Sequence, residues 1–336
     1  MATNNANRRD ADVWSMADLA TPMALRVMAT LRIADLITNG QESAFQLADA
    51  TQVDIHALDQ VLRHLVSVDL LSRDEAGRYA LTARGESLRD DHPSGMRGLL
   101  DIESAIGRAD LSFAQLLHSV RTGSAAFPLQ FGMDFWDDLA SDAARRGSYD
   151  RQMGSDVVAW APSILAAYDW GSLGQVIDVG GGNGTLLAAL LRAHPTLKGR
   201  VLDQPGAVEA AAETLAKAGL TERCDVVAGS FFDPLPAGAD GYVLCAILHD
   251  WNDTAAVAIL RRCADAVGAT GRVFVIEKTG NDGQSPRTEM DLRMLVYFGG
   301  RERGVNELVS LAGGAGLGHV EVHHNADLSI LELRRA

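Results

Sequence analysis

Short apolar runs alternate with helical patterns throughout the C-terminal half of the chain. The runs predict strands at 175–179, 200–203, 225–228, 242–248 and 272–276, with helices at 186–193 and 255–267 between them and two more strands at 319–323 and 328–333. Strand–helix alternation of this kind produces a parallel sheet with helices on both faces. The fold class is therefore α/β, with a doubly wound Rossmann-like sheet.

The N-terminal part shows a different, mainly helical pattern. Apolar residues at three- and four-residue steps predict one helix that ends near Gly40; they are Leu19, Met23, Val27, Leu31 and Ala34. A capping box over 43–46 and a cap at Asp54 predict two more helices, and 71–73 with 78–81 form a hairpin pattern. Three helices and a hairpin indicate a winged-helix-like domain at 12–104, followed by a second domain at 105–336 that opens with connecting helices at 105–170.

Composition narrows the class of protein. The chain has 336 residues, 47% of them hydrophobic and 22% charged, as in ordinary globular proteins. No apolar stretch is long enough to span a membrane, and the polar first ten residues predict no secretory signal. The cysteines Cys224, Cys245 and Cys263 form no C-x-x-C pair, so we expect free thiols and a cytoplasmic location.

Charge argues against nucleic-acid binding, although winged helices often read DNA. The formal net charge is −14, whereas DNA binding depends on neutralising phosphates. The candidate recognition helix over 54–71 has one arginine, Arg63, and three aspartates, Asp54, Asp59 and Asp69, so its charge does not suit contact with phosphates. A packing and dimerisation module is the better interpretation.

A glycine-rich loop follows the predicted strand 175–179. A dinucleotide fingerprint requires glycine at 185 or 187, where the chain has Thr185 and Leu187. The loop instead fits D-x-G-x-G-x-G, and its acid, Asp178, suits a ligand that carries an ammonium group. Asp203 ends the next strand, where a carboxylate accepts ribose hydroxyls. A plain tight turn with Asp203 as a strand-end cap is the alternative.

These features resemble those of S-adenosylmethionine-dependent methyltransferases, and further motifs narrow the resemblance. The segments 244–251 (LCAILHDW), 291–295 (DLRML) and 299–303 (GGRER) are similar to motifs of the caffeate-type (class II) O-methyltransferases. The resemblance extends from Val13 to Leu333. It implies a class I methyltransferase sheet, an N-terminal dimerisation domain, a homodimer, and conversion of S-adenosylmethionine to S-adenosylhomocysteine. Bacterial members act in antibiotic and pigment biosynthesis.

The resemblance and the strand ends together nominate binding residues. The expected cofactor site comprises Asp178, Gly180, Gly182, Asp203, Gly229, Ser230, Phe231, Cys245 and Trp251. The expected walls of the acceptor pocket are Trp136, Tyr149, Met153, Met294 and Phe298, because aromatic and methionine side chains suit a flat acceptor. Ordinary core packing is the alternative for Trp251 and for each wall residue.

His249 is the candidate general base, because it follows the apolar run 243–248 at the ligand-binding edge of the sheet. A catalytic imidazole needs a partner on its other nitrogen. The resemblance maps that partner to Glu302 or Glu332, and topology adds Glu277 at the end of the fifth strand. Asp250, the sequence neighbour, is a weaker candidate. A surface histidine and solvated glutamates are the alternatives.

The sequence thus predicts a metal-free O-methyltransferase acting on a small hydroxylated aromatic such as a phenol, naphthoate or quinone. No cluster of histidine, cysteine and aspartate has metal-ligand spacing. Two other functions stay open: a relative that performs N- or C-methylation or cofactor-assisted hydroxylation, and a winged-helix regulator that senses a small molecule.

Overall fold

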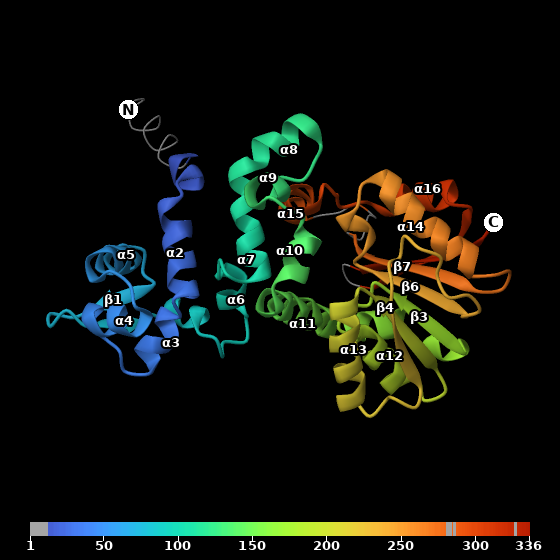
Figure 1. Cartoon of the computed structure of the whole chain (residues 1–336), viewed down its shortest axis with the longest axis horizontal. Coiled ribbons are helices and arrows are strands. Elements are labelled where there is room, and N and C mark those ends of the chain that lie inside the picture. Colours follow the sequence, from blue (N-terminus) through green and yellow to red (C-terminus); the bar gives the residue numbers. More distant parts are fainter. Residues whose placement is uncertain (1–12, 280–283, 285–286, 326–327) are drawn as a thin grey trace, which may run out of the picture. The chain divides into compact units, whose positions relative to one another are not determined.

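The computed structural model describes residues 13–279, 284, 287–325 and 328–336. It divides into two compact units, residues 1–111 and 112–336 (Figure 1). Helix α7 (Ala105–Asp110) therefore belongs to the first unit, whereas the sequence grouped it with the connecting helices of the second. The prediction of no secretory signal concerned the first ten residues. They lie outside the described part of the chain, which begins at residue 13.

The first unit contains the expected helices and hairpin. Its elements are α2 (Ala20–Thr30), α3 (Ile33–Thr38), α4 (Ala44–Thr51), α5 (Ile55–Ser67), β1 (Leu71–Arg73), β2 (Tyr79–Leu81), the 3-10 turn η1 (Gly85–Leu88), α6 (Met96–Leu100) and α7. The capping box is present, because the Ser43 hydroxyl accepts the Gln46 N–H and the Gln46 side chain accepts the Ser43 N–H. Leu47, Leu62 and Leu65 are fully buried in the core of this unit.

The first predicted helix is two helices in the structure. Arg32 adopts a left-handed conformation with φ of 54°, which ends α2 and begins α3 in a new direction. This break lets Ile33 and Ala34 be fully buried in the same core as Met28. A stripe of apolar residues at helical spacing does not reveal such a break, since both helices keep their apolar faces on one core.

The second unit is built on one seven-stranded sheet in the order β5-β4-β3-β6-β7-β9-β8. The strands are β3 (Gln175–Val179), β4 (Lys198–Asp203), β5 (Cys224–Ala228), β6 (Gly241–Cys245), β7 (Arg272–Lys278), β8 (Leu317–Asn325) and β9 (Leu328–Arg335). Strands β3 to β7 are parallel, and β9 joins β7 antiparallel and pairs with β8. The predicted doubly wound sheet is confirmed, with an antiparallel pair at one edge.

Alternating side chains on the strands face two separate cores. On β3, Ile177 packs in one core with α14 (Asp253–Ala266) and α16 (Val305–Gly314). Its neighbour Val176 packs in the other core, with α11 (Ala143–Ala167), α12 (Thr185–Ala193) and α13 (Pro205–Lys217). Among its described residues, this unit also contains α8 (Leu116–Thr122), α9 (Phe127–Phe131), α10 (Phe135–Ser141), α15 (Thr288–Phe298) and the 3-10 turn η3 (Trp170–Ser172). The 3-10 turn η2 (Leu111–Gln115) spans the boundary between the units.

Strand β6 ends earlier than the sequence predicts, and this difference shapes the site. The apolar run continues to Leu248, but the strand ends at Cys245 because Ala246 has a φ of 54°. Residues Leu248–Asp250 then form the 3-10 turn η4. His249 consequently lies on a tight turn beyond the strand end.

Two observations bear on the expected environment of the chain. Among the described residues, no helix combines the length and hydropathy that a membrane crossing requires. Cys224, Cys245 and Cys263 are free thiols.

A buried tryptophan anchors the core behind β3. Trp170 is fully buried, contacts Phe274 with ring centroids 4.8 Å apart, and donates its indole N–H to the Ile164 carbonyl at 2.9 Å. Replacing Trp170 by alanine should lower the free energy of unfolding by about 3–5 kcal/mol, because it leaves a large cavity. Urea denaturation followed by far-UV circular dichroism measures this.

The matched control is Val158→Ala, which removes an apolar side chain that is 63% exposed on α11. It should change the free energy of unfolding by less than about 0.5 kcal/mol. Equal effects of the two substitutions would contradict the assignment of Trp170 to the core.

Candidate active site

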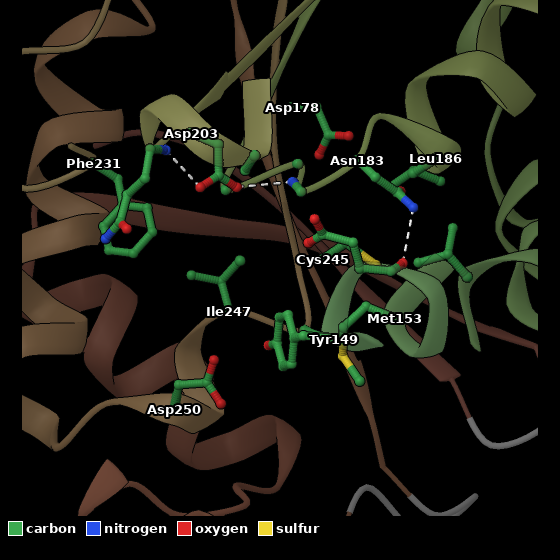
Figure 2. A pocket seen from close by; sticks show the side chains of 18 of the residues that line it. Tyr149, Met153, Asp178, Asn183, Leu186, Asp203, Phe231, Cys245, Ile247 and Asp250 are labelled. Carbon is green, nitrogen blue, oxygen red and sulfur yellow. Dashed lines mark hydrogen bonds between the residues drawn. The ribbon is translucent and has the colours of Figure 1, made fainter. Parts of the chain in front are cut away.

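A cavity opens at the carboxyl ends of β3, β4 and β6, with α11 forming a wall (Figure 2). All nine residues predicted for the cofactor line it, as do three of the five predicted acceptor walls, Trp136, Tyr149 and Met153. The sheet therefore brings these residues to one place, at the edge where open parallel sheets bind ligands.

The glycine loop after β3 needs its glycines for both conformation and space. Gly180, Gly182 and Gly184 have φ of 73°, 54° and 74°, a region that favours glycine. A Cβ on Gly180 would lie 2.6 Å from the Ile247 side chain. The Gly182 N–H donates to Asp203 Oδ2 at 2.8 Å, which ties the loop to the end of β4.

The buried Asp178 and the partly buried Asp203 give this loop its electrostatic character. Asp178 is 1% exposed, and its Oδ2 has no hydrogen-bond partner. Burial, with a contribution from nearby Asp203, raises the pKa of Asp178 to about 7. Burial also raises the pKa of Asp203. The backbone N–H groups of Gln204 and Gly182 donate to its carboxylate and partly offset this rise.

These features fit S-adenosylmethionine. An unsatisfied buried carboxylate oxygen is costly, and a cationic group bound beside it would remove that cost. An ammonium group near Asp178 and a ribose near Asp203 match the residues present. The glycine loop keeps side chains out of the space between them.

One face of α11 supplies cavity residues that the sequence analysis missed. Besides Tyr149 and Met153, the cavity is lined by Arg146, Asp150, Asp156, Val157 and Trp160. Their three- and four-residue spacing is helical, so a search for one continuous face would have found them. Arg146 Nε lies 3.5 Å from Asp150 Oδ1 within this face.

Other missed residues come from the loops after the strands and from the first turns of the helices that follow them. They are Gly181, Asn183, Thr185, Leu186, Gln204, Ala207, Phe232, Ala246 and Ile247. Asp250, the weaker candidate of the sequence analysis, also lines the cavity. The Asn183 amide donates to the Asp150 carbonyl at 2.9 Å, which joins the glycine loop to α11. No sequence spacing signals this contact, since the two residues lie on separate elements.

His249 is surrounded by carboxylates on both sides of its ring. Glu277 Oε2 lies 3.2 Å and Glu302 Oε1 3.7 Å from Nδ1, and Asp250 Oδ1 lies 3.5 Å from Nε2. Glu277 is the penultimate residue of β7 and fixes the turn, because its Oε1 accepts the Leu248 N–H at 3.0 Å. Glu277 and Glu302 are thus both brought to His249, as two of the three predicted partners.

The carboxylates control the charge of this group. Burial alone would lower the pKa of His249, but the negative charges of Glu277, Asp250 and Glu302 outweigh it and raise the pKa to about 10. Burial raises the pKa of Asp250 to about 7, although the positive charge of His249 opposes this. These carboxylates therefore favour the protonated form of the ring, and the role of His249 as general base stays a prediction.

The G-G-x-E-R segment holds the turn that carries His249. A Cβ on Gly300 would lie 2.2 Å from the His249 carbonyl oxygen, so only glycine permits this approach. The buried Arg303 guanidinium donates to the carbonyls of Leu248 at 2.7 Å and Trp251 at 2.6 Å. The Glu302 N–H donates to Asp291 at 2.8 Å, which explains the acid of the preceding motif.

Glu332, the third predicted partner, does not contact His249. It pairs across the sheet with Phe274, near the start of β7, whereas His249 lies beyond the end of β6. Its Oε1 accepts from Arg272 Nε at 2.8 Å, and Oε2 lies 3.3 Å from His323. The prediction was wrong because the antiparallel direction of β9 places position 332 at the far end of the sheet.

Glu332 also belongs to a group of side chains with metal-ligand spacing, although the sequence indicated none. The ligand atoms of Glu321, His323 and Glu332 lie within 4.8 Å of one another. The Arg272 guanidinium already neutralises Glu332 in this group.

Two of the predicted acceptor walls, Met294 and Phe298, do not line the cavity. Phe298 stacks on Trp136, with ring centroids 5.3 Å apart and planes 13° apart. Met294 is buried on α15 and does not line the cavity. Phe298 thus acts on the cavity by supporting Trp136.

Comparisons with known proteins identify the family. Residues 113–318 match the model of the O-methyltransferase domain, and residues 14–90 match that of the O-methyltransferase dimerisation domain. The chain is 53% identical to 2,7-dihydroxy-5-methyl-1-naphthoate 7-O-methyltransferase of Streptomyces carzinostaticus, over 95% of this chain and 96% of that protein. The chain belongs to the O-methyltransferase family.

Two more relatives show the range of this similarity. Aclacinomycin 10-hydroxylase RdmB of Streptomyces purpurascens is 41% identical, over 92% of this chain and 85% of that protein. The structure of NcsB1, an O-methyltransferase from neocarzinostatin biosynthesis, superposes with a TM-score of 0.91 at 52% identity, covering 96% of this chain and 98% of that one. That structure contains S-adenosylmethionine and 2-hydroxy-5-methyl naphthoic acid.

The close approach at Gly300 predicts a local defect on substitution. Gly300→Ala should push the segment away from the turn at His249, lowering the free energy of unfolding by about 1–3 kcal/mol and reducing methyl transfer. The urea midpoint and the steady-state rate measure the two effects.

Gly313→Ala is the control, because a Cβ there meets nothing within 4 Å and Gly313 lies in α16. It should leave activity unchanged and stability equal or slightly higher, since alanine favours helix. The account of Gly300 would be contradicted if the two alanine variants behaved alike.

Proposed function

We propose that this chain is an S-adenosylmethionine-dependent O-methyltransferase that methylates a hydroxyl of a small aromatic, naphthoate-type compound. The observation that carries the proposal is one cavity in which Asp178, Asp203 and the glycine loop lie opposite Tyr149 and Met153, with Asp250 at its edge. The naphthoate 7-O-methyltransferase and NcsB1, each more than half identical to this chain, support the substrate class.

The residues that hold the methyl donor are those after the strands of the Rossmann-like half. Asp178 receives the ammonium group, Asp203 the ribose hydroxyls, and the segment Gly229–Phe231 with Trp251 the adenine. When bound, S-adenosylmethionine supplies a methyl group already activated by a sulfonium centre. The chain adds orientation, exclusion of water and a place for the acceptor proton, and orientation alone accounts for large accelerations.

The acceptor side is formed by aromatic and thioether side chains. Trp136 and Tyr149 meet edge to face with centroids 5.8 Å apart, and Met153 lies one turn along α11 from Tyr149. Such a wall suits a flat ring. Burial, followed by the charges of Asp250 and Asp203, raises the pKa of Tyr149, so its hydroxyl stays neutral and able to donate a hydrogen bond.

Proton removal falls to the group at the turn η4. His249 is held by Glu277 and Glu302, and the three carboxylates around it favour its protonated form. We therefore assign His249 to a proton-accepting group rather than to the role of an isolated base.

The match to the dimerisation domain supports a homodimer, and the similarity to NcsB1 from neocarzinostatin biosynthesis supports a role in antibiotic biosynthesis. We place the protein in the cytoplasm, as its free thiols suggest.

Cofactor-assisted hydroxylation is the second candidate, because the relative that is 41% identical is named a hydroxylase. Mass spectrometry separates the two reactions: incubation with 1,4-dihydroxy-2-naphthoic acid should add the mass of one CH2 group rather than of one oxygen atom. The cluster of acids around His249 favours methylation, since hydroxylation has no evident need of it.

The donor site gives a direct binding test. Calorimetric titration with S-adenosylmethionine should show that Asp203→Ala raises the Kd by about 10- to 150-fold, since charge-assisted hydrogen bonds contribute about 1.5–3 kcal/mol. Asp265→Ala, an exposed aspartate on α14, should leave the Kd unchanged. A wild-type chain that binds neither the donor nor its demethylated product would overturn the proposed function.

A further inference from the structure

A hydrogen bond joins the glycine loop to the helix that forms the acceptor wall. The side-chain amide of Asn183, in that loop, donates to the backbone carbonyl of Asp150 on α11 at 2.9 Å, and Figure 2 shows this bond as a dashed line that begins at Asn183. In a helix, a carbonyl also accepts the N–H of the residue four positions later, so Asn183 uses the second lone pair of the oxygen. The two sides of the cavity are thereby connected at a backbone atom of α11.

This bond lies between two residues of the acceptor wall. Asp150 follows Tyr149 directly, and Met153 comes three residues later on the same helical face, with both wall side chains lining the cavity. Backbone hydrogen bonds connect successive turns of a helix, so a displacement of the Asp150 carbonyl is passed to both side chains. Asn183 therefore controls the position of the wall from the donor side.

The amide of Asn183 is held in a fixed orientation by the start of α12. Its Oδ1 accepts the hydroxyl of Thr185 at 2.7 Å and the backbone N–H of Thr185 at 3.3 Å. These two bonds direct Nδ2 towards Asp150. Asn183 lines the cavity, yet both of its side-chain polar atoms bond to the protein, which assigns it to positioning rather than to ligand contact.

Gly154 provides the space that this bond needs. It is buried within α11, where glycine is less favourable than alanine. A Cβ at this position would lie 2.6 Å from Asn183 Nδ2 and 3.3 Å from Thr185 Oγ1. A side chain there would push the amide away from the Asp150 carbonyl. Two residues on separate elements, Asn183 and Gly154, are thus both required for one contact.

We propose that Asn183 is a positioning residue that couples the two ligand sites, so that a bound donor strengthens the binding of the aromatic acceptor. This inference rests on the proposed function, in which the glycine loop holds the donor and Tyr149 and Met153 face the acceptor. A glycine-rich backbone has wide conformational freedom, and a donor that fixes the loop also fixes Asn183 and, through it, the wall. The acceptor then binds to a wall that is already ordered and loses less entropy.

Calorimetric titration with 1,4-dihydroxy-2-naphthoic acid measures this coupling, on the chain alone and on the chain saturated with S-adenosylhomocysteine. In the wild-type chain, S-adenosylhomocysteine should lower the Kd of the naphthoate by at least about fivefold, the lower end of the usual range for coupled sites. By linkage, the naphthoate should lower the Kd of S-adenosylhomocysteine by the same factor.

Asn183→Asp is the most specific variant, because it keeps the shape of the side chain and the oxygen that accepts from Thr185, and removes the N–H donor. The coupling should fall below about twofold, well under the usual range. The Kd of S-adenosylhomocysteine measured alone should stay close to the wild-type value. A residue with a purely structural role would weaken both ligands and leave their coupling unchanged.

Gly154→Ala disturbs the same contact from the helix side and should remove the coupling as well. In the double variant Asn183→Ala/Gly154→Ala, the shorter side chain at 183 leaves space for the added methyl group. The loss of coupling should therefore be no greater than in either single alanine variant. Gly147→Ala is the matched control on α11, because a Cβ there meets only the end of the Arg151 side chain, at 3.5 Å, and it should leave the coupling intact.

Amide hydrogen exchange follows the same coupling without any acceptor. S-adenosylhomocysteine should slow the exchange of backbone amides over 149–156 in the wild-type chain, because the ordered loop then holds this turn of α11. It should not slow them in Asn183→Asp.

A wild-type chain whose affinity for the naphthoate does not respond to S-adenosylhomocysteine would overturn the role of Asn183 and leave the proposed function intact. The same holds for an Asn183→Asp variant that keeps the full coupling. Failure of the wild-type chain to bind S-adenosylmethionine would instead overturn the proposed function, and this inference with it.

Discussion

Three buried or nearly buried carboxylates crowd one imidazole at the ends of β6 and β7, and this electrostatic arrangement decides how the site works. Glu277, Glu302 and Asp250 lie 3.2–3.7 Å from the ring nitrogens of His249. Carboxylates gathered around one ring inside a protein repel one another unless a cation lies between them. The group is therefore stable with His249 protonated, and the surplus negative charge favours a cationic ligand.

The rest of the second unit serves to hold this group. The parallel sheet brings the ends of β3, β4, β6 and β7 to one edge, which places Asp178 and Asp203 beside the same cavity as Asp250. The left-handed Ala246 ends β6 early and starts the turn of His249. The Arg303 guanidinium donates to a carbonyl of that turn, and Gly300 lets its own backbone approach the turn closely. Each of these is a local backbone constraint with a consequence for the chemistry.

The sequence predicted the fold well and the site in part, for identifiable reasons. Strand–helix periodicity and the glycine loop located the sheet, Asp178 and Asp203, since these signals are local, and the family resemblance added the remaining predicted cofactor residues, all of which line the cavity. The break at Arg32 and the early end of β6 at Ala246 escaped, because a left-handed residue leaves no trace in hydrophobic spacing. Glu332 was misplaced because the direction of β9 depends on tertiary pairing. Arg146 and Asp250 were missed or undervalued, since neither stands in a motif whose spacing indicates which way a side chain points.

The charge of His249 is the most direct test of this account. Long-range ¹H–¹⁵N NMR of the imidazoles, with His249→Gln for assignment, reports the protonation of each ring nitrogen across a pH series. The account predicts that His249 is an imidazolium at pH values near neutrality and loses its proton around a pKa of about 10, because the carboxylates stabilise the charged form. A neutral ring near pH 7.5 that titrates close to the ordinary value of about 6.5 would contradict it.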